Sequence, residues 1–350
     1  TNSARLLKHD FGPYWRFILT DMLTWLSGPD PLSSSLAASC ISEISHCSGQ
    51  PNFITVLKSN IDYVINQLGL QIRCPTVYPF APRIMAGLLR LVGCEVIGNV
   101  DCLLGEIMDN LAVYKNHDGY VYDLLGVLSQ VGNYHFFTLE GPGGDGRSKR
   151  NETVQVPERI IRLVTHFMLS DRRKIRLRAM EVLVEVSKHA YKAGEDSFLP
   201  LVHWMWPALL GRVLDPNPDV GIAAFKSIVE FCQIAGSFMQ KRINHELWPV
   251  ACKAHDQLTV MECFSKISRI DGIKLGLRTI EGLTDIFVAH LDNMNGPERE
   301  AAARLGESLI LGYPDIMWFH LVCQSSQPLY HRSRLIPSSP ALQHLISRIP

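Results

Sequence analysis

The sequence has no excess of charge of either sign. Its 350 residues include 34 Lys and Arg against 34 Asp and Glu, so the formal net charge is zero. A protein that holds nucleic acid or an anionic membrane by bulk attraction carries a surplus of cations. We therefore do not expect this chain to bind either nucleic acid or a membrane through its overall charge.

The sequence also lacks a long apolar segment and paired cysteines. The longest apolar run, residues 198–214, contains His203 and Arg212 and is too short to span a bilayer. The nine cysteines stand singly, without a C-x-x-C pair, which is typical of reduced thiols in a cytoplasmic or nuclear protein. We expect this location, and we expect the chain, which begins at Thr1, to be part of a longer protein.

Motifs for catalysis are absent from the sequence. It has no G-x-S-x-G, P-loop or protein-kinase signature, and none of its 13 histidines falls in H-E-x-x-H or in a zinc-binding spacing. Gly141, Gly143 and Gly146 spell G-x-G-x-x-G, but no apolar helical face follows them and the βαβ pattern is missing. We predict no catalytic, cofactor-binding or metal-binding residues. An enzyme with a nucleotide bound through Gly143 is the hypothesis that the sequence favours least.

Strand-like alternation is missing too, and helical periodicity takes its place. Between residues 202 and 213 apolar side chains recur on one helical face, and a second face runs from residue 220 to 231. The Asp-Pro-Asn-Pro sequence of residues 215–218 breaks the helix between them, because proline has no amide proton. The pattern predicts an antiparallel helix pair that cannot bury both faces alone, which is the unit of an α-solenoid.

This pair resembles a HEAT repeat in three features. Pro207 lies in the first helix, an Asp-Pro turn follows, and Val220 precedes Ala224 by four positions. It departs from many HEAT repeats at Gly221, where they have an arginine. An ordinary helical hairpin in a bundle is the alternative that this unit leaves open.

Repeat spacing supports the solenoid. Ala179 and Ala224 lie 45 positions apart, and Trp206 and Trp248 lie 42 apart, within the range of about 40–47 expected of HEAT and armadillo repeats. The predicted fold is therefore all-α, an α-solenoid of HEAT-like helical hairpin repeats. In the next hairpin we expect the helix after Trp248 to pair with a helix that spans residues 273–291.

Composition suggests where the chain divides. Residues 139–157 are rich in glycine and charge and poor in apolar residues, so we expect a flexible loop there. HEAT-like repeats are predicted before it, in residues 1–138, and after it, in residues 158–312. The tail, residues 313–350, is predicted to pack as a cap or to stay partly disordered.

One dense cluster of cations is a candidate binding site. It consists of five residues near the start of a predicted helix: Arg172, Arg173, Lys174, Arg176 and Arg178. Such a cluster can contact phosphate or an acidic partner. It can also be the solvated start of a repeat helix, with Asp171 as a local partner.

Trp204 is the second candidate. Trp206 falls on the apolar stripe of its helix, whereas Trp204 is offset from that stripe. An exposed tryptophan can anchor a protein partner. Packing in the core is the alternative.

Three segments resemble one family more closely than they resemble HEAT repeats in general. They are Asn60–Arg73 (NIDYVINQLGLQIR), Ile175–Val182 (IRLRAMEV) and Leu199–Phe225 (LPLVHWMWPALLGRVLDPNPDVGIAAF). Each is similar to a segment of the Tel-interacting protein family, of the Tti-one type, in the same order along the chain. The resemblance covers most of residues 30–260.

The resemblance implies a scaffold without catalytic activity, the carboxyl-terminal part of a subunit of the TTT complex. Its partners are then Tel-two-like and Tti-two-like subunits, the kinases related to phosphatidylinositol kinases (TOR, ATM and ATR) and the Hsp-ninety machinery. The complex supports the maturation, stability and assembly of those kinases. A HEAT-repeat adaptor for transport or nucleic acid, which would use residues 172–178, is the alternative of a different class.

Overall fold

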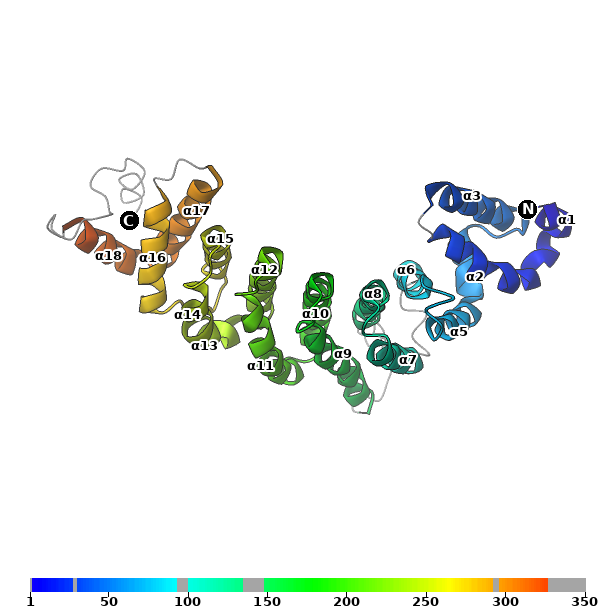
Figure 1. Ribbon diagram of the computed structural model, residues 1–350, viewed down its shortest axis with the longest axis horizontal. Helices are drawn as coiled ribbons and strands as arrows, with labels where there is room; N and C mark the ends of the chain where they lie inside the picture. The colour runs from blue at the N-terminus through cyan, green and yellow to red at the C-terminus, as the bar shows by residue number, and fades with distance from the viewer. Residues whose placement is uncertain (1, 28–29, 93–99, 135–147, 292–295, 327–350) are drawn as a thin grey trace. The chain divides into compact units, whose positions relative to one another are not determined.

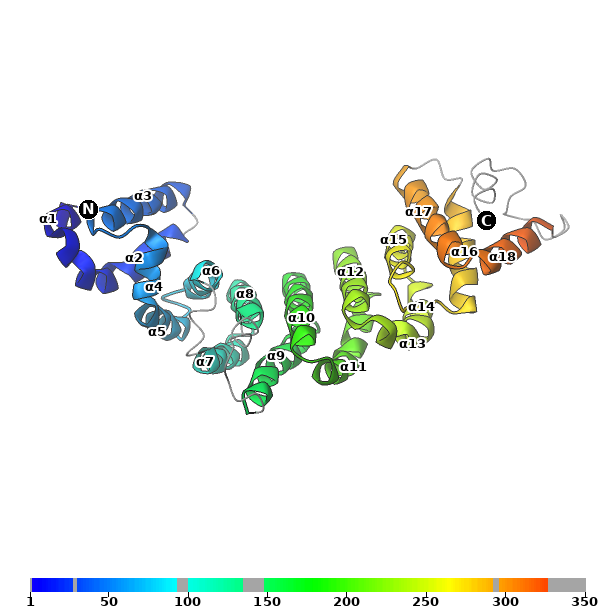
Figure 2. The same cartoon turned by 180° about the vertical axis from the view of Figure 1, so that it is seen from behind.

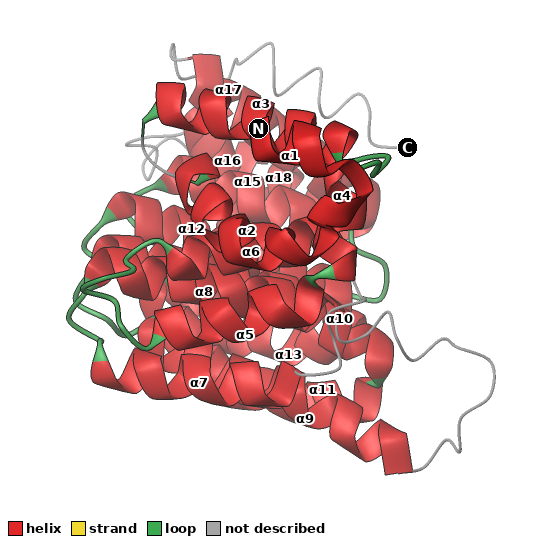
Figure 3. Cartoon of the chain, turned by 90° about the vertical axis from the view of Figure 1, so that its right-hand side faces the viewer, coloured by secondary structure: helices red, strands yellow, loops and turns green. Residues whose placement is uncertain are grey.

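The computed structural model describes residues 2–27, 30–92, 100–134, 148–291 and 296–326 (Figures 1 and 2). Within these ranges every regular element is a helix, and there is no strand (Figure 3). The all-α prediction is confirmed. The helices form two compact units, unit 1 with residues 1–201 and unit 2 with residues 202–350.

Unit 1 is built from helical hairpins. Its helices α6, α8 and α10 pack side by side, and each also packs against the helix before it in the chain (Figure 1). The elements are α1 (Asn2–Leu7), a 3₁₀ helix (Lys8–Tyr14), α2 (Trp15–Leu26), α3 (Pro31–Cys47), α4 (Phe53–Ser59), α5 (Ile61–Ile72), α6 (Ala81–Val92), α7 (Val100–Val113), α8 (Asp118–Tyr134), α9 (Ser148–Phe167) and α10 (Arg173–Ala193).

Unit 2 continues the same plan. The boundary between the units falls inside α11 (Glu195–Arg212). In unit 2, α12 packs against α15, α15 against α17, and α17 against both α16 and α18. The elements are α12 (Pro218–Ala235), a 3₁₀ helix (Gly236–Met239), α13 (Gln240–Arg242), a π-helical turn (Ile243–Leu247), α14 (Trp248–Ala251), α15 (Gln257–Ile267), α16 (Leu277–Leu291), α17 (Gly296–Gly312) and α18 (Pro314–Ser326).

The predicted Asp-Pro turn between α11 and α12 is confirmed. Asn217 caps α12, since its side-chain oxygen accepts a hydrogen bond from the amide of Asp219 at 3.2 Å. The side chain of Asp215 is only 1% exposed and pairs with Arg212 at 3.1 Å. Asp215 also accepts a hydrogen bond from the amide of Asn217 at 3.0 Å. The turn therefore ends one helix and starts the next with its polar groups satisfied.

The position of Gly221 explains why this hairpin departs from the usual HEAT sequence. A Cβ atom at Gly221 would lie 3.2 Å from the carbonyl oxygen of Val213, closer than most such contacts. Any side chain there would push α12 away from the end of α11. With no arginine at position 221, the buried carboxylate of Asp215 pairs with Arg212 at the end of α11.

Three expectations from the sequence either need correction or concern residues that the structure describes only in part. Helix α9 begins at Ser148, not at Glu158, because the helix continues through residues that lack an apolar face. The G-x-G-x-x-G glycines, residues 141–146, lie outside the described residues. Of the predicted tail, residues 314–326 form α18, and the segment after them is not described. The division of the chain at residues 139–157 stays a prediction.

The expected hairpin after Trp248 is correct only in part, since Trp248 does contact α16 but the two helices are not consecutive in the chain. A separate helix, α15, lies between α14 and α16, and Asp256 caps it by accepting a hydrogen bond from the amide of Thr259 at 3.1 Å. Ile273 belongs to the turn before α16 and not to the helix. Helix α16 packs most extensively against α17, and it also contacts α15 and α18.

The π-helical turn fixes the segment that leads into α16. Asn244, in this turn, donates hydrogen bonds through Nδ2 to the carbonyl oxygens of Gln240 and Lys274, both at 3.0 Å. Its Oδ1 accepts hydrogen bonds from the amide of Gly276 at 2.7 Å and from Oγ1 of Thr279 at 3.1 Å. A π turn inserts one extra residue and so changes the direction in which the next side chains point. One amide side chain thereby joins two helices and the turn between them.

Asn244→Ala should destabilise unit 2. The substitution leaves partly buried backbone groups without partners, and each lost hydrogen bond of this kind costs about 1 kcal/mol or more, so we expect a loss of roughly 2–4 kcal/mol in the free energy of unfolding. Urea denaturation followed by circular dichroism measures the change. His245→Ala, at the exposed neighbouring position of the same turn, is the control and should change stability little. Equal stability of the two variants would contradict this role of Asn244.

Close packing of α14 and α16 depends on one glycine. A Cβ atom at Gly282 would overlap the ring of Trp248, with Cη2 at 3.1 Å and Cζ2 closer still. Trp248 is buried and meets Phe264 of α15 edge to face, with ring centroids 5.5 Å apart. The indole therefore has no free space into which it could move.

Gly282→Ala should lower the stability of the chain although alanine favours helices. We expect overpacking to cost about 1–3 kcal/mol, more than the gain of about 1 kcal/mol in helix propensity. Gly211→Ala is the matched control, because Gly211 is exposed in α11 and a methyl group there would meet no other atom within 4 Å. Thermal unfolding should show a lower midpoint for Gly282→Ala and an equal or higher one for Gly211→Ala. A higher midpoint for both would disprove the packing argument.

Candidate functional site

The turns that precede α6, α8 and α10 lie next to one another along one edge of unit 1. We call residues 73–80, 114–117 and 168–174 the turn edge. The hydroxyl of Tyr114 donates a hydrogen bond to the carbonyl oxygen of Arg73 at 3.4 Å, and Arg172 pairs with Asp118 at 3.5 Å. Each turn is thus joined to its neighbour by side chains, so the edge is one continuous surface.

The turn edge holds the first half of the predicted basic cluster. Arg172 is the N-cap residue of α10, and Arg173 and Lys174 occupy the first turn of that helix; all three are exposed. Asp118, the partner of Arg172, begins α8, and its side chain is 44% exposed. Ion pairs between exposed side chains stabilise a fold only weakly. All three cations therefore lie at the surface, and the pair of Arg172 with Asp118 contributes little to holding the hairpins together.

The second half of the cluster has structural contacts. Arg176 donates a hydrogen bond to the carbonyl oxygen of Ser170 at 2.8 Å and so closes the turn before α10. Arg178 pairs with Glu181 at 2.9 Å and lies over the ring of Tyr122, 5.3 Å from its centroid. The structure therefore divides the predicted cluster into an exposed part and a packed part.

The exposed part is placed where cations are unfavourable. The amino end of a helix carries a partial positive charge, so acidic residues are favoured there and cations are not. Helix α10 has no acidic residue in its first turn and no side-chain cap. By contrast, α12 and α15 each begin with a side chain that caps the helix. The dipole of α10 therefore does not favour the cations at its start, of which Arg172 pairs with Asp118 of α8.

Exposed apolar side chains flank these cations. Leu169, in the turn before α10, is 56% exposed, and Val113, next to the turn before α8, is 70% exposed. Val77 and Tyr78 are exposed in the turn before α6. Lys115 and His117 are also exposed, in the turn before α8. The turn edge thus presents both positive charge and apolar surface.

Trp204 lies at the surface of unit 2, on α11. Its residue is 37% exposed, whereas Trp206 is 3% exposed and donates a hydrogen bond through Nε1 to Glu246 at 2.7 Å. Next to Trp204, the Nδ1 atom of His203 lies 3.0 Å from Nη2 of Arg242. Trp204 belongs to unit 2 and the basic cluster to unit 1, so the structure does not bring the two candidates together in one unit.

Sequence reasoning missed other exposed aromatic residues. Phe17 and Trp25 of α2 and Trp318 and Phe319 of α18 are more than half exposed. In α2 the signal was present, because Phe17 and Trp25 lie off the apolar face formed by Trp15 and its helical neighbours. Large apolar side chains at the surface are typical of protein-binding regions.

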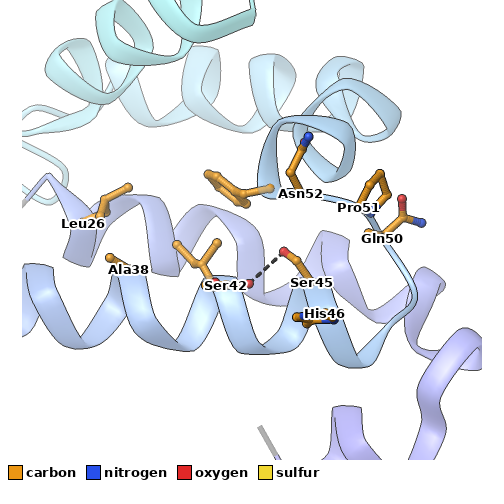
Figure 4. A pocket seen from close by; sticks show the side chains of 10 residues that line it. Leu26, Ala38, Ser42, Ser45, His46, Gln50, Pro51 and Asn52 are labelled. Carbon is orange, nitrogen blue, oxygen red and sulfur yellow. Dashed lines mark hydrogen bonds between the residues drawn. The ribbon is translucent and has the colours of Figure 1, made fainter.

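A small hollow lies between α3 and the segment that leads into α4 (Figure 4). Its volume is about 290 Å³. The side chains around it are Leu26, Ala38, Ile41, Ser42, Ser45, His46, Gln50, Pro51, Asn52 and Phe53. The hydroxyl of Ser45 donates to the carbonyl oxygen of Ile41 at 2.8 Å, and the Asn52 side chain caps α4. These two polar groups thus serve the helices to which they belong.

The described residues contain no metal-binding group and no reactive buried thiol. No three His, Cys, Asp or Glu side chains among them are placed to hold a metal ion. Burial raises the pKa of Cys232 and that of Cys263, which keeps both thiols protonated and weakly nucleophilic.

The sequence predicted no segment long enough to span a bilayer, but the helical run Pro218–Ala251 is long and apolar enough by length and composition. Half of its most apolar window is buried within the protein, and it includes the core residues Val220, Ile228 and Phe231 of α12. Packing against neighbouring helices therefore accounts for much of its apolar character.

Comparison with known proteins relates the chain to one family. A family model described as the TTI1 C-terminal TPR domain matches residues 140–318, and one described as TELO2-interacting protein 1 matches residues 19–109. TPR and HEAT repeats are both helical hairpins that stack into α-solenoids.

Two curated relatives carry the same name, TELO2-interacting protein 1 homolog. The mouse (Mus musculus) protein is 21% identical over 319 residues, which cover 70% of this chain and 29% of the relative. The human (Homo sapiens) protein is 19% identical over 293 residues, which cover 62% of this chain and 26% of the relative. The chain thus spans less than a third of the length of the relatives that it matches.

Lys174→Glu should stabilise the free chain. It replaces a cation by an anion in the first turn of α10, where the helix dipole favours negative charge, so we expect a gain of roughly 0.5–1 kcal/mol in the free energy of unfolding at low salt. Denaturant unfolding at low and high salt measures it, and salt should reduce the gain. Lys226→Glu, at an exposed position in the middle of α12, is the control and should give no comparable gain. A loss of stability in Lys174→Glu would mean that Lys174 has a structural role.

Proposed function

Because this chain belongs to the TELO2-interacting protein 1 family, we propose that it is a scaffold without catalytic activity that binds other proteins through its helical repeats. The observation that carries the proposal is the family match over residues 140–318, more than half of the chain. A stack of helical hairpins supports this role, because each hairpin contacts only its neighbours and leaves its outer surfaces available.

Exposed aromatic side chains support protein binding in both units. Phe17 and Trp25 are exposed in unit 1, and Trp204, Trp318 and Phe319 are exposed in unit 2. Aromatic residues supply much of the binding energy at protein interfaces when they enter a pocket of the partner. We propose that Trp204 is one such anchor, since its neighbour Trp206 already fills the core position on the same helix.

The proposed partner follows from the names of the relatives. The mouse and human proteins are named as interacting with TELO2. We propose that this chain binds a TELO2-like (Tel-two-like) subunit, and a Tti-two-like subunit, as part of the TTT complex. The proposal extends to the function of that complex with the Hsp-ninety machinery, which is to support the maturation, stability and assembly of TOR-, ATM- and ATR-type kinases in cytoplasm and nucleus.

Co-expression of this chain with a TELO2-like subunit should yield a complex that stays together through affinity capture and gel filtration. Trp204→Ala should weaken the affinity about tenfold or more, because an aromatic anchor contributes about 2 kcal/mol or more to binding. Leu311→Ala, at an exposed apolar position in α17, is the control and should bind like the parent chain.

Two negative results have different meanings. If the parent chain elutes alone and the TELO2-like subunit is folded, the proposed function is wrong. If the parent chain captures the subunit and Trp204→Ala captures it equally well, the complex exists but Trp204 is not an anchor. Circular dichroism of each variant checks that its helices are intact.

A further inference from the structure

The turn edge of unit 1 has more positive than negative charge although the chain as a whole is neutral. Its exposed charged residues include the cations Lys115, Arg172, Arg173 and Lys174 and the carboxylate of Asp171, while the partly exposed Asp118 begins α8 next to the edge. The pair of Arg172 with Asp118 joins the turns before α8 and α10, so these residues belong to one surface. The surface is therefore suited to an anionic partner.

The helix dipole of α10 adds to this attraction. Amide groups at the amino end of a helix attract anions, and a long helix such as α10 carries the full effect. Helix α10 has cations in its first turn and no capping side chain. The charges of these side chains and the positive end of the helix dipole therefore lie together at the start of α10. A carboxylate from a partner would offset both the repulsion between the cations and their repulsion by the helix dipole.

Apolar side chains on the same edge indicate that the partner is a protein. Leu169 and Val113 are exposed beside the cations, and Val77 and Tyr78 are exposed one turn further along. A protein segment with acidic and apolar residues can contact both kinds of side chain. Single-stranded nucleic acid is favoured by several aromatic side chains on which bases stack, and this edge has one exposed tyrosine.

We propose that the turn edge of unit 1 binds an extended acidic segment of a partner protein, with acidic side chains at Arg173 and Lys174 and apolar ones at Leu169 and Val113. The proposal deepens the scaffold function and rests on it. Neighbouring helices pack about 8–10 Å apart, so three successive turns span roughly 20 Å. An extended segment of about six or seven residues covers that length.

The test uses the whole chain and a fluorescently labelled synthetic peptide of about nine residues in which Glu alternates with Leu. Fluorescence anisotropy at low salt should detect binding. Arg173→Glu/Lys174→Glu should weaken it about tenfold or more, since two attractive contacts become repulsive. Lys226→Glu/Lys241→Glu makes the same change of charge at exposed positions in α12 and α13, and its affinity should stay within about twofold of that of the parent chain.

Two competitors identify the class of ligand. A peptide with Lys at each Glu position should not displace the labelled peptide, and single-stranded RNA of the same length should displace it only at much higher concentration. Equal peptide affinity in Arg173→Glu/Lys174→Glu and the parent would overturn the inference. Tighter binding of RNA than of peptide would overturn it too, and would favour a nucleic-acid adaptor.

The scaffold proposal is tested separately, by capture of the TELO2-like subunit. A parent chain that captures the subunit but does not bind the peptide contradicts only the proposal for the turn edge. A chain that binds the peptide but never captures the subunit contradicts the assignment of that partner and leaves the turn edge as a site for acidic segments of another protein.

Discussion

A helical hairpin of this chain has two apolar faces and can bury only one of them against its own second helix. In unit 1 the other face is covered by the next hairpin, since α8 packs against both α6 and α10. The fit between α8 and α10 is close. A Cβ atom added at Gly132 of α8 would lie 2.5 Å from Cγ2 of Val186 in α10. Because the helix sides are occupied by stacking, the turns and the outer helix faces remain for binding other molecules.

Periodicity in the sequence predicts helices well where a long apolar face lies between clear breaks. The faces on both sides of Asp215–Pro218 were predicted from spacing alone and are buried as expected. Periodicity does not predict the first turns of α9, which have no apolar face. It also does not predict α15, a short helix that comes after the π-helical turn and α14. The cap at Asp256 was the available signal for α15. In such places tertiary contacts decide the structure.

The candidate residues show a similar limit. A run of cations such as residues 172–178 identifies where charge is concentrated, but not which side chains fold back on the protein. Arg178 reaches Tyr122 because α10 packs against α8, and the sequence of α10 alone does not specify that neighbour. Trp204 is offset from the apolar stripe in the sequence and is 37% exposed, whereas Trp206 on the stripe is 3% exposed, so the core packing that the sequence left open for Trp204 applies to Trp206 alone. The apolar stripe of a single helix indicates which of its side chains are buried, but it does not indicate which side chains of another helix they contact.

Charged side chains also pair between neighbouring hairpins of the stack. Arg83 of α6 pairs with Asp123 of α8 at 3.2 Å, and Arg304 of α17 pairs with Glu262 of α15 at 3.4 Å. The pair of Arg304 with Glu262 is exposed and adds little stability, whereas the side chain of Asp123 is only 12% exposed. Both pairs favour the observed stacking of the hairpins over a shifted one, because each charge meets its partner only in this arrangement. The cations in the first turn of α10 are different, because the dipole of their own helix opposes them. Asp118 of α8 already brings one carboxylate to the start of α10 through its pair with Arg172, and we propose that a partner protein brings others.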